Sequence, residues 1–130
     1  MALNRIWNYQ GMKTVLADTN IILWTFSGGP DFREAISEAV PGWNLAIPSC
    51  VIAELEKLDS NDSKAALKMC KTLKIVDIGN GYTDTMLIDA AKKGYLIATN
   101  DREMLSELKS LKLNALRIRE KNKLVSTEGI

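Results

Sequence analysis

The 130-residue chain contains no histidine, and this single absence excludes several classes of enzyme. Serine–histidine triads, histidine general bases and histidine-ligated zinc sites all require an imidazole. Cysteine is scarce as well: Cys50 and Cys70 each lie in an apolar helical context, where we expect small buried hydrophobic residues rather than a disulfide, redox or metal role. Any metal chemistry must therefore rely on oxygen ligands, which hard divalent cations such as Mg²⁺ and Mn²⁺ prefer.

The chain also lacks long apolar runs and an excess of either charge. No segment reaches the roughly 18 consecutive apolar residues that a membrane span requires, and there is no leader peptide, so we expect a cytoplasmic protein without membrane contact. The 17 basic and 16 acidic residues give a net charge of +1, so overall charge does not by itself favour nucleic acid. Hydrophobic residues make up 46% of the chain, which is enough for the core of one domain.

Short apolar segments alternate with helical patterns along the chain. Strands are predicted at 15–17, 44–47, 75–78, 95–98 and 115–118, and helices at 20–26, 31–40, 49–58, 64–73, 84–93 and 102–108. A polar tail follows the last predicted strand. This alternation predicts an α/β fold, a three-layer α/β/α sandwich with a central parallel sheet.

Four acids lie beside segments that are predicted to be buried. Asp18 and Asp101 follow strands, whereas Glu54 and Asp84 lie early in helices. In parallel folds the carboxyl ends of strands and the amino ends of helices meet at one edge of the sheet, so the four side chains can converge. Ionised carboxylates near a core are costly without a neutralising partner, so acids without matching cations indicate a bound metal ion. Taken singly, each acid could instead be a turn residue, a helix cap or a solvated surface residue.

Three stretches together resemble the PIN-domain family of metal-dependent ribonucleases. They are VLADTNIIL at 15–23, IPSCVIAELEKL at 47–58 and GYTDTMLIDAAKKGYLIATNDREM at 81–104. Asp-Thr-Asn alone is a weak signal, but its combination with Ser-x-x-x-x-Glu and Thr-Asn-Asp, in order and on the expected elements, is specific. The last two stretches are most similar to the archaeal branch related to ribosomal-RNA-processing nucleases. A single PIN-like domain with a basic C-terminal tail is expected at 12–130, and an N-terminal extension that could be flexible at 1–11.

The resemblance implies a site of four acids that binds one or two Mg²⁺ or Mn²⁺ ions. Such an endoribonuclease would cut single-stranded RNA by direct attack of a metal-activated water on phosphorus, leaving a 5′-phosphate and a 3′-hydroxyl. The metal would be held mainly by Asp18 and Asp101, with Asp84 and Glu54 binding directly or through water. The predicted catalytic and metal-binding residues are thus Asp18, Glu54, Asp84 and Asp101.

Asn20 and Thr99 match polar positions that usually support the acid cluster in this family. Thr99 could orient a water or an acid, or could equally be a structural cap at the end of its strand. The chain departs from the family pattern at Thr85, because related sequences often carry a second aspartate directly after the position of Asp84. This departure bears on the geometry of a second metal position.

Basic residues gather in two parts of the chain. Each cluster alone is typical of a solvated helix face or a charged tail, but beside an acidic metal site these residues become candidates for holding an RNA backbone. The RNA-binding candidates are Lys64, Lys68, Arg102, Arg117 and Arg119.

The predicted partner is RNA, including a ribosomal-RNA precursor, and the resemblance also implies a homodimer. Two alternatives stay open within the same fold: a toxin-type ribonuclease held by an antitoxin protein, and a non-catalytic RNA-binding assembly module. A phosphoacceptor signalling domain would share the layers, but it usually has paired acids after the first strand and a lysine after the last. Asp18-Thr19 and Arg117-Ile118-Arg119 supply neither.

Overall fold

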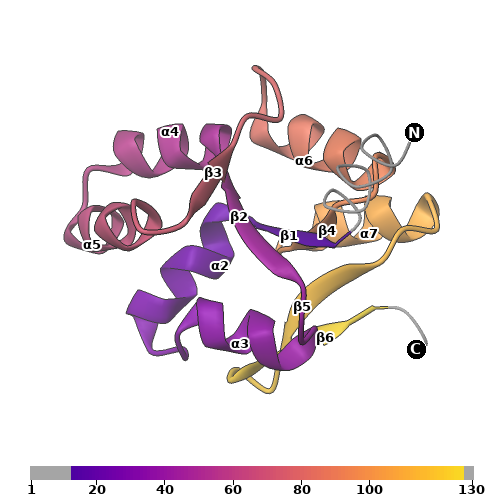
Figure 1. The fold of residues 1–130 in the computed structure, drawn as a ribbon, viewed down its shortest axis with the longest axis horizontal. Coiled ribbons are helices and arrows are strands. Elements are labelled where there is room, and N and C mark those ends of the chain that lie inside the picture. Colours follow the sequence, from indigo (N-terminus) through magenta and orange to yellow (C-terminus); the bar gives the residue numbers. More distant parts are fainter. Residues whose placement is uncertain (1–12, 128–130) are drawn as a thin grey trace.

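The computed structural model describes residues 13–127, which form one six-stranded sheet flanked by helices (Figure 1). The extension expected at 1–11 lies outside the described residues. The strands run in the spatial order β3-β2-β1-β4-β5-β6. All neighbouring pairs are parallel except β5 with β6, which is antiparallel. The strands are β1 (Thr14–Ala17), β2 (Asn44–Pro48), β3 (Lys74–Val76), β4 (Leu96–Ala98), β5 (Ala115–Arg119) and β6 (Lys123–Ser126).

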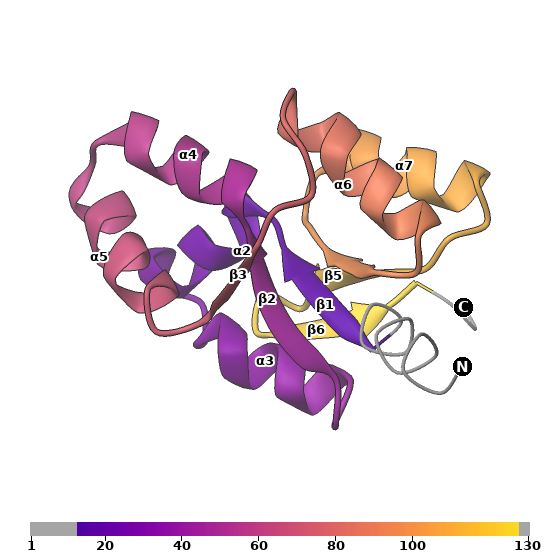
Figure 2. The same ribbon diagram turned by 45° about the horizontal axis from the view of Figure 1, so that its top comes forward.

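Helices cover both faces of this sheet, so the predicted three-layer α/β/α sandwich is confirmed (Figure 2). On one face lie α2 (Thr19–Trp24), the short 3-10 helix η1 (Thr25–Ser27), α3 (Phe32–Ala39), α4 (Ser49–Leu58) and α5 (Asn61–Cys70). On the other face lie α6 (Thr83–Lys92) and α7 (Arg102–Ser110). No helix in residues 13–127 is long and apolar enough to cross a membrane.

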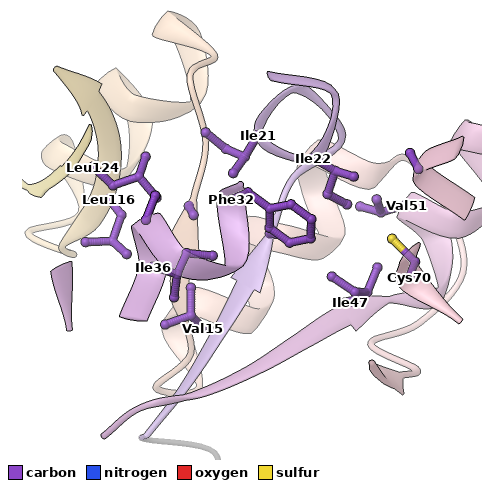
Figure 3. Close-up of a cluster of buried hydrophobic side chains, with 14 of the residues drawn as sticks. Val15, Ile21, Ile22, Phe32, Ile36, Ile47, Val51, Cys70, Leu116 and Leu124 are labelled. Carbon is purple, nitrogen blue, oxygen red and sulfur yellow. The ribbon is translucent and has the colours of Figure 1, made fainter. Parts of the chain in front are cut away.

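The core has two parts because successive side chains of a strand point to opposite faces. In β1, Val15 packs with the helices of the first half of the chain, and Leu16 packs against α6 and α7. In the larger cluster the Phe32 ring is surrounded by aliphatic side chains that include Ile22 and Ile36 (Figure 3). Burial of each such side chain is worth about 1.5–3 kcal/mol, so the core fixes the sheet on which the candidate site is built.

The strand order reverses direction beside β1, and this reversal locates the site. From β1 the chain adds β2 and β3 on one side, and then adds β4 and β5 on the other. Crossovers of constant hand place the helices of the two halves on opposite faces, as observed. The carboxyl ends of β1 and β4 therefore form the topological switch point, where open α/β folds usually bind their ligands.

Two segments differ from the sequence prediction. Part of the expected polar tail forms β6, because Leu124 is buried in the larger cluster and pairs with Ile118 of β5. The helix expected at 64–73 is displaced toward the N-terminus and spans Asn61–Cys70. Its start is fixed by a reciprocal capping box, in which the Ser60 and Ser63 side chains each accept from the other residue's backbone N–H.

Candidate active site

Asp18 directly follows β1 at the switch point and is only 5% exposed. Its backbone N–H donates to the carbonyl of Ala98 (2.9 Å), which ties the end of β1 to β4. Its Oδ1 accepts from the backbone N–H of Thr19 (2.8 Å) at the N-cap of α2, and its Oδ2 accepts from the Thr99 hydroxyl (2.7 Å). Among the described residues no lysine or arginine forms an ion pair with this carboxylate. Its negative charge is therefore buried without a cationic partner, a costly arrangement.

Thr99 connects two of the predicted acids. Its side chain is fully buried, and its hydroxyl donates to Asp18 while accepting from the backbone N–H of Asp101 (3.1 Å). Asp101 in turn caps α7, with Oδ1 accepting from the backbone N–H groups of Glu103 (2.9 Å) and Met104 (3.2 Å). The Thr99 hydroxyl thus orients the Asp18 carboxylate and also satisfies the backbone just beyond β4.

Asn20 braces the same region from the first turn of α2. Its Nδ2 donates to Asp18 Oδ2 (3.3 Å), and its Oδ1 accepts from the backbone N–H of Asn100 (3.0 Å). One amide therefore joins the start of α2 to the loop that carries Asp101.

Glu54 approaches the cluster from α4, where its side chain is half-buried. Its Oε1 accepts a hydrogen bond from the Thr19 hydroxyl, which connects α4 to the residue after Asp18. Thr19 was not among the predicted site residues. Its place in the Asp-Thr-Asn tripeptide was the available signal, because the residue between Asp18 and Asn20 begins the helix that Asp18 caps.

Asp84 lies in the first turn of α6, and its side chain is open to solvent. Partial burial raises the pKa of this carboxyl, and the negative charges of Asp101, Glu54, Glu103 and Glu107 raise it further. Glu103 and Glu107 were missed by the sequence prediction. They lie one turn apart on the helix that Asp101 caps, so the sequence did indicate that the two side chains lie on the same side of α7. Their proximity to Asp84 depends on the packing of α6 beside α7, which the sequence did not reveal.

The same electrostatic coupling reaches Asp18. Burial raises its pKa, hydrogen bonds from Thr99 and from the Thr19 backbone lower it, and the charges of Glu54 and Asp84 raise it again. Since Asp84 is coupled in turn to Asp101, the four predicted acids form one electrostatic group at the carboxyl edge of the sheet.

The chemistry of these donors fits a hard divalent cation. All the groups are carboxylates, and the most buried of them, Asp18, has no cationic neighbour among the described residues. Within 13–127, however, no three acidic or cysteine side chains already stand close enough to hold an ion. Mutual repulsion favours such separation, so the acids would have to draw together around a bound cation.

The five basic candidates are divided between two ends of the molecule. Lys64 and Lys68 lie on α5, which Figures 1 and 2 place at the opposite end from α7. Arg102 is exposed at the first position of α7, directly after Asp101, while the remaining two candidates, Arg117 and Arg119, lie on β5 beyond the end of β4.

A basic groove with a volume of about 600 Å³ lies between α7 and β5. Arg102, Ser106 and Lys109 recur at the spacing that places residues along one side of a helix, so this side of α7 leads from Asp101 toward the groove. The groove is lined by Leu105, Ser106, Lys109, Lys112, Leu113, Asn114, Arg117 and Thr127, with three basic residues and no acid. Lys109 and Lys112 belong to the second basic cluster that the sequence indicated, although they were not among the five RNA-binding candidates chosen from it.

Comparisons with known proteins agree with this architecture. A family model described as Fcf1 matches residues 42–125. The solved "Structure of the PIN domain endonuclease Utp24" is similar with a TM-score of 0.78 and 23% identity, over 92% of this chain and 95% of that chain. At this identity the likeness shows the fold alone. None of the curated protein sequences matches the chain.

Proposed function

Because the chain belongs to the Fcf1 family, whose PIN-like domain is one of ribosomal-RNA processing, we propose that it is a metal-dependent endoribonuclease acting on single-stranded RNA. The observation that carries the proposal is the buried carboxylate of Asp18 at the switch point, without a cationic partner in the described residues and coupled to other acids. A buried carboxylate without a cationic partner destabilises a folded protein unless it binds a ligand that neutralises its charge.

Asp18 and Asp101 would hold the cation, with Asp84 and Glu54 contributing directly or through water. When bound, a divalent cation supplies a polarised water and neutralises charge on the phosphodiester. Other groups of the chain orient these acids through hydrogen bonds. Thr99 bonds Asp18 directly, and Asp101 is held in place as the N-cap of α7, so the two acids are oriented before substrate arrives.

Hydrolysis by direct attack of water on phosphorus would leave a 5′-phosphate and a 3′-hydroxyl. The alternative route uses the ribose 2′-oxygen as nucleophile and yields 2′,3′-cyclic phosphate ends. That route commonly employs histidine as the general base, and this chain has none.

The groove between α7 and β5 supports RNA as the substrate. Arg102 stands beside Asp101, and Lys109, Lys112 and Arg117 continue the positive charge away from the acids. Such a strip attracts phosphates without reading sequence. Arg119 lies farther along β5 near Glu120 (3.9 Å). The other two candidates, Lys64 and Lys68, would contact only an RNA long enough to reach α5.

A ribosomal-RNA precursor is the substrate that the family membership favours over the target of a toxin. A homodimer and an antitoxin partner are further expectations of the PIN resemblance, which size measurement of the purified protein and co-purification can test. A reducing compartment such as the cytoplasm is a further expectation from the sequence, whose two cysteines were predicted to play no disulfide role.

The deciding experiment is cleavage of end-labelled single-stranded RNA with Mn²⁺, with Mg²⁺ and with EDTA. The Asp101→Asn variant keeps a good N-cap while removing the charge, so its loss of activity would report on chemistry rather than folding. We expect cleavage to fall about 100-fold or more, since loss even of groups supporting a metal ligand costs 10–100-fold.

The matched control is Asp89→Asn, which removes an acid from α6 whose one ion pair within residues 13–127 is with solvent-exposed Lys92 (4.0 Å). This variant should retain wild-type cleavage. Cleavage that persists in EDTA, or in Asp101→Asn, would contradict the proposed mechanism. Products ending in 2′,3′-cyclic phosphate would contradict the proposed nucleophile. RNA binding without any cleavage would favour the non-catalytic assembly module.

A further inference from the structure

Tyr82 is 86% exposed, although every other aromatic side chain in residues 13–127 is at least partly buried. It belongs to the loop between β3 and α6, which Figures 1 and 2 show rising between α4 and α6. Tyr82 is the N-cap residue of α6 but makes no capping bond with its side chain. Asp84, one of the four acids, follows two positions later. An open aromatic ring therefore stands at the edge of the candidate active site.

Glycine geometry holds this loop in place. Gly79 and Gly81 have positive φ values of 116° and 132°, which other residues rarely adopt. A Cβ at Gly79 would lie 2.8 Å from the Met86 sulfur, so the loop packs closely onto α6. At its far end Thr83 is buried, and it lines the same pocket as Cys50 at the start of α4. The exposure of Tyr82 is thus built into an anchored loop.

Tyr82 also lines a pocket of about 340 Å³ that opens beside Glu54. This volume lies at the lower end of the range for small-molecule sites, roughly 300–1,000 Å³. One wall is α4, and the other is the β3–α6 loop. The lining residues are Ser49, Cys50, Ala53, Glu54, Lys57, Asn80, Gly81, Tyr82 and Thr83.

We infer that this pocket is a nucleobase subsite, in which a base of the RNA near the cleaved phosphodiester stacks on the Tyr82 ring. This inference rests on the proposed ribonuclease function. The negative charge of Glu54 in the wall disfavours a phosphate, but it does not oppose an uncharged base. The amide of Asn80 can both donate to and accept from a base edge, and Lys57 can meet the attached backbone.

Stacking explains why an aromatic ring would be kept open to water at this place. Single-stranded RNA is recognised largely by splayed bases that stack on aromatic side chains, and every base offers a suitable face. The geometry therefore gives the site two separate contacts with RNA: a base at Tyr82 on one side of the acids, and phosphates at Lys109 and Arg117 on the other.

The test combines substitutions at Tyr82 with a scan of the RNA. A short cleavable oligonucleotide is prepared in versions that each carry one abasic nucleotide, and KM and kcat are measured for wild type, Tyr82→Ala and Tyr82→Phe. We expect Tyr82→Ala to raise KM about tenfold, within the range measured for loss of one stacked base, and to leave kcat within about twofold. Tyr82→Phe keeps the ring and should keep the wild-type KM.

The abasic scan makes the result specific. One abasic position near the cleavage site should raise KM for wild type but have no further effect on Tyr82→Ala, because both changes remove the same contact. Leu111→Ala, which shortens an exposed apolar side chain on α7's far end, is the control and should behave as wild type. A wild-type KM in Tyr82→Ala, or additive effects at every abasic position, would overturn the subsite while leaving the nuclease proposal intact. Absence of cleavage by the wild-type protein would instead overturn the proposed function.

Discussion

Replacing Thr99 by valine tests the bond on which the candidate site depends. Valine has nearly the same shape as threonine but carries no hydroxyl, so the change removes the donor to Asp18 Oδ2 and the acceptor for the Asp101 backbone N–H. Thr99 is fully buried, and water cannot easily replace the lost bonds. We therefore expect a destabilised protein in which both acids are less well oriented.

The expected cost follows from the two bonds. A hydrogen bond to a charged group contributes about 1.5–3 kcal/mol, and a backbone donor left without its partner adds about 1 kcal/mol. The sum is about 3 kcal/mol at neutral pH. For a domain of this size each kcal/mol changes the melting temperature by about 4 °C, so Thr99→Val should melt about 12 °C below wild type.

The assay is urea unfolding of the metal-free protein at several pH values, with Thr99→Ser as the matched variant. Serine keeps the hydroxyl and loses one methyl group, which costs about 1 kcal/mol. The difference in the free energy of unfolding between wild type and Thr99→Val should become smaller as the pH falls through the pKa of Asp18, because a protonated carboxyl is a weaker acceptor. Equal free energies of unfolding for Thr99→Val and Thr99→Ser would refute the reasoning. A difference between wild type and Thr99→Val that does not change with pH would refute it as well.

Three further predictions concern the acids, the groove and the thiols. The pKa of Asp18 is raised above its ordinary value of 3.8. The favourable contribution of Asp18 to the free energy of unfolding is therefore complete below pH 3.8, and it is lost as the pH rises through the pKa of Asp18 in the folded protein. Denaturant titration in EDTA should show this loss, and Mn²⁺ at 100 times its Kd should add about 2.7 kcal/mol at pH 7. In the groove, Arg117→Gln should reduce the salt dependence of RNA binding by about one phosphate contact, a slope change of about 0.7, whereas Lys68→Gln should leave binding of a short RNA unchanged. Burial raises the pKa of the Cys70 thiol to about 11, so alkylation followed by mass spectrometry at pH 8 should modify it only after unfolding.

The layered fold could be predicted from the sequence because apolar strands and amphipathic helices alternate in an unambiguous pattern. The strand expected at 115–118 and the helix expected at 102–108 agree closely with β5 and α7. The segment that forms β6 was missed, because its pairing depends on a hairpin turn in a strongly polar stretch, and only Leu124 reaches the core. The formation of β6 therefore depends on its pairing with β5 and on the burial of Leu124 rather than on the local strand propensity of its sequence.

The sequence by itself determined which chemistry is possible. A chain without histidine, with acids placed after strands and early in helices, is limited to oxygen-ligand sites at the carboxyl edge of a parallel sheet. Residue types and their spacing follow directly from the chain, so these properties did not require coordinates.

Only the tertiary structure decided how these residues meet. The hydroxyl of Thr99 bonds Asp18 across 81 positions of sequence, and Glu54 accepts from Thr19 across 35. The coupling of Asp84 to Glu107, the basic groove beside α7 and the exposed ring of Tyr82 likewise depend on how helices pack over the sheet. Hydrogen bonds and charge interactions act over a few ångströms, and packing alone brings groups distant in the chain within that range.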